Sequence, residues 1–294
     1  MFRAKAAFWI LLTLLLVRFY GRYGGNSLQI SFLDVGQGDA ALVVLPGGKS
    51  FLLDAGIRSA RTDRGREVVI PALAARGILD LEAVVLSHPD ADHLGGLLAV
   101  LESLRVRAFW LPRHFLPPKR LQLKETLEVA SRRGVYVFPW VVPSRFVLSS
   151  GVQWWVGLGK GESDNDHSLL VRLAYGPCSV LFTGDIGAQT ERGLTDWGRS
   201  TVLKVSHHGS RFSSDSAFLK RVRPRLAVVS AGANNRYGHP HPDTLERLRE
   251  VGTEILRTDF HGRVDISFDR AGRFACRSAL GACGAGYCSE AKPN

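Results

Sequence analysis

Short apolar runs that end in Gly or Asp recur along the chain from Leu28 onward. The runs LQISFLDV, ALVVLP and SFLLDAG follow one another, with the polar turns GQGD and PGGKS between them. Runs of this length and spacing predict a meander of strands. Apolar residues at helical spacing predict helices at 66–77 and 94–104, and the run AVVLSH at 83–88 predicts a buried strand between them.

The second half of the chain repeats this order of strands and helices. We predict strands at 168–176, 178–185, 201–210 and 225–232, helices near 187–197, 215–222 and 243–251, and a final hairpin. Two meanders that are each followed by helices favour two sheets packed face to face with helices outside. The fold class is therefore α/β, a four-layer αββα sandwich that forms one domain over residues 26–275.

The first 25 residues have a different pattern. Arg3 and Lys5 precede an uncharged run at 6–17, and Arg18 follows it. This order is typical of a signal peptide or an N-terminal membrane anchor, and no A-x-A-like cleavage site follows, which favours a retained anchor. With the basic flank in the cytoplasm, the folded domain would lie outside it, membrane-anchored or secreted.

Three of the four cysteines fall near the C-terminus. Cys276, Cys283 and Cys288 lie in a Gly/Ala-rich segment, 276–294, which we expect to be a poorly ordered tail, and Cys178 lies apart. Their spacing matches no zinc-binding pair. In an exported protein two of the three tail cysteines could form a disulfide and leave one thiol over.

The formal net charge is +11. Such a surface attracts polyanions, either nucleic acid or an anionic membrane, before any specific contact forms. The alternative is a basic surface that only keeps the protein soluble.

The segment LSHPDADHLGG carries the clearest chemistry. His88 and Asp90 are two residues apart after an apolar strand, so their side chains point the same way in an extended loop, while Asp92 and His93 begin a helix. Helix capping would explain one acid but not two acids and two histidines. We predict ligands for two divalent metal ions, Mn or Zn, because imidazole and carboxylate together suit such ions.

Further candidates lie at other strand ends. Asp185 in LFTGD is the natural carboxylate to bridge two ions, and Asp54 in FLLDAG could orient a ligating histidine through its second ring nitrogen. Adjacent side chains on a strand point in opposite directions, so only one histidine of SHHGS is expected to bind metal. We assign His208 as the ligand and His207 as a phosphate contact or proton donor.

The loop NNRYGHPHP at 234–242 is rich in groups that bind phosphate or donate protons. His241 is the first candidate for proton transfer because the prolines on both sides restrict its backbone. Asn235, Arg236 and His239 are candidate substrate contacts. A surface loop with incidental histidines is the alternative.

With LDVGQGDA, LLDAG, SHPDADHLGG, NDHSLLV, LFTGD, LKVSHHGS and NRYGHPHP in this order, the chain resembles the metallo-β-lactamase-like domain of the ComEC competence family, from about residue 28 to about residue 268. The resemblance implies an αββα fold of the metallo-β-lactamase type with a site at the sheet edges. It also implies a role in degrading the DNA strand that is not imported during transformation. The ligand set that it implies is His88, Asp90, Asp92, His93, Asp185 and His208.

The chain departs from the superfamily pattern at two places. The usual motif is His-x-His-x-Asp-His, and Asp90 occupies the second histidine position, which leaves the identity of the metal open. The separate mid-chain histidine has no clear counterpart; His167 is a candidate metal ligand or supporting residue, with Asn165 or Asp164 as alternatives. ComEC proteins also carry a membrane channel and an oligonucleotide-binding-like region, so we expect an excised or stand-alone hydrolase.

The leading hypothesis is a metal-dependent phosphodiesterase or nuclease acting on DNA. Asp92, His207 and His241 are the predicted catalytic residues, and Arg211 and Arg236 would hold neighbouring phosphates. Expected partners are DNA, the membrane through the N-terminal segment, and competence channel proteins. One alternative is a hydrolase of a small phosphodiester, cyclic nucleotide or lactone, and another is a DNA-binding module with a non-catalytic metal site.

Overall fold

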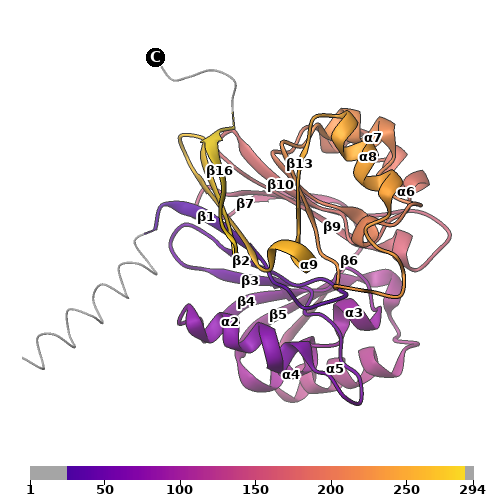
Figure 1. Ribbon diagram of the computed structural model, residues 1–294. Helices are drawn as coiled ribbons and strands as arrows, with labels where there is room; N and C mark the ends of the chain where they lie inside the picture. Colours follow the sequence, from indigo (N-terminus) through magenta and orange to yellow (C-terminus); the bar gives the residue numbers. More distant parts are fainter. Residues whose placement is uncertain (1–24, 289–294) are drawn as a thin grey trace, which may run out of the picture.

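Two β-sheets packed face to face form the centre of the molecule (Figure 1), whose computed structural model describes residues 25–288. In the described residues the first sheet has nine strands, in the order β16 (Gly281–Tyr287), β15 (Arg273–Ser278), β14 (Val264–Asp269), β1 (Ser27–Phe32), β2 (Ala41–Val44), β3 (Ser50–Leu53), β4 (Asp80–Val85), β5 (Arg105–Pro112) and β6 (Tyr136–Trp140). The second has seven, in the order β13 (Glu254–Arg257), β12 (Leu226–Val229), β11 (Val202–Lys204), β10 (Cys178–Phe182), β9 (Leu169–Tyr175), β8 (Gln153–Leu158) and β7 (Ser144–Val147).

Helices cover the outer face of each sheet. The nine-stranded sheet is covered by the π-helical turn η1 (Gly65–Val69), α2 (Ile70–Ala75), α3 (Ala91–Leu94), α4 (Leu97–Ser103) and α5 (Leu121–Arg132). The seven-stranded sheet is covered by α6 (Ala188–Arg192), α7 (Ser216–Val222) and α8 (Pro242–Glu250), while α9 (Thr258–His261) joins β13 to β14. Short 3₁₀ turns are η2 (Arg113–Phe115), η3 (Asn165–His167), η4 (Thr195–Trp197) and η5 (Ser206–Gly209). The predicted αββα sandwich is confirmed.

The largest apolar core lies between the sheets. Phe32 from β1 and Phe182 from β10 meet there with ring centroids 5.7 Å apart, and Phe51 packs on Trp154 at 4.8 Å. Two further cores lie between each sheet and its own helices. Central strands such as β3 and β12 are therefore buried on both faces, which explains why their sequences are nearly all apolar.

In each sheet, a group of parallel strands brings the loops that follow those strands to the same edge. Strands β3, β4, β5 and β6 pair in parallel, as do β10, β11, β12 and β13. The carboxyl ends of parallel strands share one edge of a sheet, so the loops that follow β3, β4, β10, β11 and β12 gather together.

Several element bounds differ from the sequence prediction. The helix expected at 94–104 is two helices, α3 and α4, separated by Gly95 and Gly96. A Cβ atom on Gly95 would clash with the backbone of Arg58, and one on Gly96 with the carbonyl of Ala55, so both glycines permit close backbone packing under the loop. The strand expected at 201–210 ends at Lys204.

The expectation of a poorly ordered tail from residue 276 is wrong for most of that segment. Cys276 lies within β15, and β16 pairs with β15 as the outermost strand of the first sheet. The domain therefore continues past the predicted boundary at 275.

All four cysteines are paired, in the bonds Cys178–Cys288 and Cys276–Cys283. The expected leftover thiol is therefore absent from the described residues, because Cys178 is the partner of a tail cysteine.

The predicted signal or anchor segment lies outside the described residues, save for its last position. Between residues 25 and 288, none of the helices has the length and apolar character that crossing a membrane requires.

Candidate metal centre

The predicted metal-ligating residues come from the loops at the shared edge of the two sheets. Strand β4 continues through the buried Leu86 and Ser87 into the loop that carries His88, and α3 begins directly afterwards. Asp90 is the N-cap residue of α3, yet its side chain makes no capping hydrogen bond. The capping explanation for the acids of this motif therefore finds no support, and both carboxylates face the site.

One cluster of ligand atoms surrounds the Nε2 atoms of two histidines. His93 Nε2 and His208 Nε2 are 3.3 Å apart. Asp185 Oδ2 lies 3.3 Å from the first and 3.2 Å from the second, and Asp92 Oδ2 lies 3.3 Å from His208 Nε2. Two imidazoles and two carboxylates thus converge at a distance that suits one shared cation.

A second group lies beside the first and shares Asp185. His88 Nε2 is 3.6 Å from Asp90 Oδ2 and 4.0 Å from Asp185 Oδ2. The other oxygen of Asp90 pairs with Arg120 at 2.8 Å. Asp185 therefore lies between the two groups, where the sequence analysis expects a bridging carboxylate.

The opposite ring nitrogens of these histidines are held by buried acceptors. Asp54 Oδ2 lies 2.9 Å from His93 Nδ1, and the same carboxylate accepts hydrogen bonds from the backbone and hydroxyl of Ser87. His208 Nδ1 lies 2.9 Å from the carbonyl oxygen of Ser230. Such partners fix the orientation and tautomer of a ligating imidazole and leave Nε2 for the metal.

His207 and His208 lie in a turn rather than in a strand. Both have left-handed backbone conformations, with φ angles of 50° and 53°. The argument that neighbouring side chains of an extended strand point apart does not apply to this geometry. His208 is buried and faces Asp185, whereas His207 is partly exposed, with its ring centroid 5.6 Å from that of His239.

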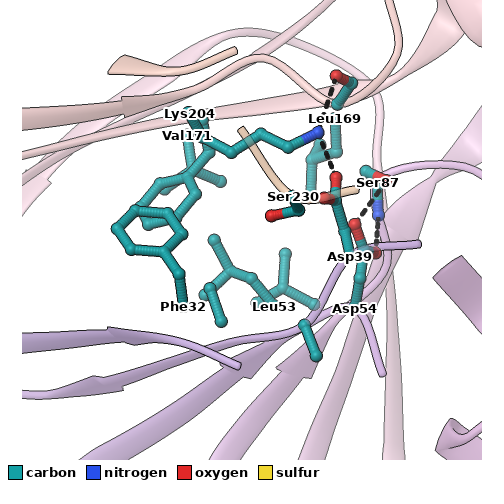
Figure 2. Close-up of a pocket in the computed structure, with 14 residues that line it drawn as sticks. Phe32, Asp39, Leu53, Asp54, Ser87, Leu169, Val171, Lys204 and Ser230 are labelled. Carbon is teal, nitrogen blue, oxygen red and sulfur yellow. Dashed lines mark hydrogen bonds and ion pairs between the residues drawn. The ribbon is translucent and has the colours of Figure 1, made fainter. Parts of the chain in front are cut away.

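Two residues of this centre were missed by the sequence analysis. Lys204, the last residue of β11, forms an ion pair with Asp39 from the β1–β2 loop, and its Nζ lies 3.5 Å from Asp185 Oδ1. Figure 2 shows the lysine reaching across the small cavity toward Asp39, with Asp54 and Ser87 beside it. The segments LDVGQGDA and LKVSHHGS were recognised, and they contain both residues.

Four buried residues, Asp39, His93, Asp185 and His208, make up a group that could hold a metal ion. Within this group the contacts of Asp39 with the imidazoles are to Nδ1 atoms, at 3.6 and 3.7 Å, and not to the Nε2 atoms. The carboxylate of Asp92, by contrast, lies 3.3 Å from His208 Nε2, the nitrogen that is free to bind metal. We therefore regard Asp39 mainly as the ion-pair partner of Lys204.

The electrostatics of the centre are strongly coupled. Burial alone would raise the pKa of Asp185, but the charges of His208, His93 and Lys204 outweigh burial and hold its pKa well below the usual range. Burial alone would lower the pKa of His208, but Asp185 and Asp39 raise it to about 10. The carboxylates thus attract protons onto the imidazoles, and a divalent cation would compete for the same sites.

The donor set fits a divalent metal. His88 Nε2 and Asp185 Oδ1 are buried and have no hydrogen-bond partner among the described residues, although Asp185 Oδ1 has the ammonium group of Lys204 3.5 Å away. Buried polar atoms without partners are costly, so a ligand at these positions would relieve that cost. Imidazole and carboxylate together suit zinc, manganese or iron.

His167 and Asp164, two candidates for the mid-chain metal ligand, contact other residues than those of the metal centre. The ring of His167 stacks on His114 with centroids 3.7 Å apart. Asp164 pairs with Arg120. The neighbouring Ser168 instead lies 3.5 Å from His88 Nδ1 through its hydroxyl.

In the loop at 234–242 the candidates have different roles. Asn235 stabilises the conformation of the loop, because its side chain forms hydrogen bonds with the backbone of Gly232, Tyr237 and His239. Burial, and then the charges of His207 and His208, lower the pKa of His239 to about 4.

His241 caps α8. Its Nδ1 accepts a hydrogen bond from the backbone of Asp243, and its own backbone N–H donates to the carbonyl of Gly209 at 2.8 Å, next to His208.

Known proteins resemble this chain across most of its length. The model of the family described as the Metallo-beta-lactamase superfamily matches residues 33–233. ComE operon protein 3 of Bacillus subtilis (strain 168) is 30% identical over 266 residues, which cover 84% of this chain and 34% of that protein. Competence protein ComA of Neisseria gonorrhoeae is 31% identical over 255 residues, which cover 84% of this chain and 33% of that protein. The chain thus spans about a third of the length of these curated relatives.

Solved structures share the fold at low sequence identity. A metal-dependent hydrolase of the beta-lactamase superfamily aligns with a TM-score of 0.51 and 16% identity, covering 78% of this chain and 95% of that one. Zn(2+)-bound PqqB from Methylobacterium extorquens aligns with a TM-score of 0.51 and 12% identity, covering 75% and 85%. Because the family match spans more than half of the chain and contains the histidine–aspartate motif, Asp185 and His208, the chain belongs to the metallo-beta-lactamase superfamily of metal-dependent hydrolases.

Proposed function

We propose that this hydrolase cleaves the phosphodiester backbone of DNA and degrades the strand that is not imported during DNA uptake. The observation that carries the proposal is a pair of exposed arginine–aromatic contacts, one directly after His208 of the metal centre and one in the loop at 234–242. The competence-related names of two relatives support the same context.

The first contact follows His208 closely in the chain. The guanidinium of Arg211 lies over the ring of Phe212, 4.6 Å from its centroid, and that ring is 66% exposed. The second contact is between Arg236 and Tyr237, at 4.9 Å, and the tyrosine is 54% exposed. Exposed aromatic rings stack unpaired bases, and neighbouring guanidinium groups bind phosphates.

The second contact is connected to the metal centre by a row of rings. Tyr237 lies 5.8 Å from His239, and His239 lies 6.4 Å from His208, measured between ring centroids. A nucleotide stacked on Tyr237 would therefore lie close to the metal centre. The net charge of +11 would draw such a polyanion to the surface.

Divalent cations, when bound at this centre, supply Lewis acidity and lower the pKa of water. The chain itself supplies the ligands, the buried positive charge of Lys204 and a hydrogen-bond donor. His241 suits the last role, because acceptance of a hydrogen bond at Nδ1 leaves the proton on Nε2. That N–H would donate a hydrogen bond to the leaving oxygen, and water would supply the proton that this oxygen takes up.

We also propose that the domain works outside the cytoplasm. Pairing of all four cysteines is typical of proteins in oxidising compartments. The basic and apolar pattern of residues 1–25 is consistent with export or anchoring at a membrane. Labelling of thiols in the protein from intact cells, without reductant, would test this: four reactive thiols would contradict it.

The activity can be tested with the full chain in detergent, end-labelled single- and double-stranded DNA, and either Mn²⁺ or Zn²⁺. We expect cleavage by the parent protein and its loss in Asp185→Asn and His208→Ala. Asp196→Asn, an exposed change with the same loss of charge, is the matched control and should cleave normally. Intact DNA in the presence of bound metal would overturn the proposal.

Substrate class can be tested by comparing DNA with bis-p-nitrophenyl phosphate and a lactone. Loss of one stacked base corresponds to roughly 5- to 100-fold in affinity. Phe212→Ala and Tyr237→Ala should therefore raise the KM for single-stranded DNA by that factor and leave turnover of the small phosphodiester nearly unchanged. Faster hydrolysis of the lactone than of either phosphodiester would favour a different substrate.

A further inference from the structure

A second cavity opens at the end of the seven-stranded sheet that is opposite to the metal centre. Its volume is about 820 Å³. The charged side chains that line it are all arginines, Arg172, Arg199, Arg223 and Arg225, and hydroxyl groups of Ser179, Ser200 and Thr201 lie among them. Among residues 25–288, no carboxylate lines the cavity.

Strand directions show that the cavity and the metal centre lie at opposite ends. Strand β11 begins after Thr201, which lines the cavity, and ends at Lys204 in the metal centre. Strand β12 likewise begins after Arg225 and leads to Ser230, the partner of His208. The cavity is therefore separate from the substrate-binding loops.

Two of the arginines are held in place by the protein. Arg172 donates from Nε to the hydroxyl of Ser200 and from Nη2 to that of Ser179, both at 3.1 Å. Arg225 donates to the carbonyl of Tyr287 at 3.0 Å, and its guanidinium lies 5.0 Å from the ring centroid of Phe274. These contacts orient the guanidinium groups without neutralising them.

The other two arginines, Arg199 and Arg223, are exposed. Within residues 25–288, none of the four forms an ion pair with a carboxylate, whereas other arginines of this protein do, among them Arg58, Arg66, Arg120 and Arg192. Four guanidinium groups around one hollow produce a positive potential that an anion with several oxygens would balance.

The wall of the cavity is covalently fixed. Gly286, Tyr287 and Cys288 line one side, and the bond between Cys288 and Cys178 attaches this segment to the start of β10. The last residues of the first sheet are thereby joined to the second sheet at the cavity. The site is thus built across both sheets.

The cavity is at the same end of the molecule as the start of β1. Ser27 pairs with Asp269 at the end of β14, and the strand after that turn, β15, begins with Arg273, which pairs with Tyr287 in the cavity wall. Figure 1 shows the start of β1 and the end of β16 on the same side. In the sequence, the apolar run 6–17 with its basic flanks comes shortly before β1.

We propose that this cavity binds the phosphate-bearing headgroup of an anionic membrane lipid. The chemistry is that of guanidinium and hydroxyl groups around a phosphodiester, and the position at the end of the molecule where β1 begins, shortly after the apolar run 6–17 in the sequence, favours a lipid over nucleic acid. Binding would hold this end of the domain on the membrane and leave the metal centre, at the other end, facing away from it. The inference is independent of the proposed DNA cleavage.

The test uses the full chain in dodecyl maltoside micelles and isothermal titration calorimetry. The probes are dihexanoyl phosphatidylglycerol, dihexanoyl phosphatidylcholine, inorganic phosphate and a twelve-residue oligothymidylate. The variant is Arg199→Ala/Arg223→Ala, which removes two exposed side chains. Arg105→Ala/Arg132→Ala removes two exposed charges elsewhere and is the matched control.

We expect phosphatidylglycerol to bind at least tenfold more tightly than phosphatidylcholine, with a tenfold or greater loss in the cavity variant and less than a twofold change in the control. DNA cleavage by the cavity variant should be unchanged. Equal binding of the two lipids, or an equal loss in the control, would overturn the proposal. So would binding of inorganic phosphate without phosphatidylglycerol, or a loss of oligothymidylate affinity alone.

Discussion

The Nζ atom of Lys204 lies 3.5 Å from Oδ1 of Asp185, inside the centre that the metal-ligating histidines form. The lysine is 3% exposed and also pairs with Asp39. Burial alone would lower its pKa, but Asp39 and Asp185 raise it, so this side chain is a permanent positive charge. The carboxylates are therefore partly balanced before any metal binds.

Lys204→Met should destabilise the metal-free protein. Removal of one partner leaves Asp39 and Asp185 buried without that counter-charge, and breaking a buried pair costs about 3–5 kcal/mol. Urea unfolding in the presence of EDTA measures the loss, with the exposed Lys220→Met as control. A loss no larger than that of the control would show that the lysine charge does not support the centre.

Asp54→Asn should weaken metal binding without removing a direct ligand. The carboxylate holds His93 Nδ1 at 2.9 Å and accepts two hydrogen bonds from Ser87. Loss of such a supporting acceptor typically lowers metal affinity roughly 10- to 100-fold. Competition with a chromogenic chelator measures the affinity; Asp34→Asn, an exposed change, should leave it unaltered, and unaltered affinity in Asp54→Asn would refute the role.

His241→Asn should distinguish the two roles of His241, as the N-cap of α8 and as a donor to the leaving oxygen. Asparagine is a good N-cap residue, so the free energy of unfolding should change by no more than about 0.5 kcal/mol. Loss of the Nε2 proton should lower kcat for DNA roughly 100-fold or more. Normal turnover in this variant would mean that His241 is only a helix cap.

Glu191 should make stability depend on pH. Its side chain is fully buried in α6. The hydroxyl of Ser206 donates a hydrogen bond to Oε1 at 2.6 Å, and the backbone N–H of Asp215 donates to Oε2 at 2.7 Å. Arg221 donates to the backbone carbonyl of Glu191. Burial raises its pKa from 4.5 to about 7, and the nearby Asp215 charge adds to this. The folded state therefore binds the proton more tightly than the unfolded state.

The consequence is a loss of stability as pH rises from about 4.5 to about 7 and a constant contribution above that range. Glu191→Gln cannot titrate, so the difference in unfolding free energy between parent and variant should shift by about 2–3 kcal/mol between pH 5 and pH 8, in favour of the variant at high pH. Parallel stability curves for the two proteins would refute this assignment.

Much of the site could be predicted from the sequence because its residues follow apolar strands. The motif at 88–93 and Asp185 each come directly after a buried run, and such runs end at a sheet edge. The four layers follow from the same pattern, since strands that are apolar on both faces need cover on both sides. The order of the motifs also indicated the family, which the family match confirms.

The tertiary structure alone decided which distant residues meet. In the sequence, Lys204 is a single lysine in an apolar strand. Its ion pair with Asp39 depends on how β11 is placed relative to the β1–β2 loop. Strand β16 has a Gly/Ala-rich sequence with low β propensity, and it forms because β15 offers an edge and disulfides hold it. The arginines of the second cavity are likewise scattered in the sequence and become one site where the strands of one sheet begin. Local patterns report how each segment packs, whereas contacts between segments depend on the register and order of strands, which no single segment encodes.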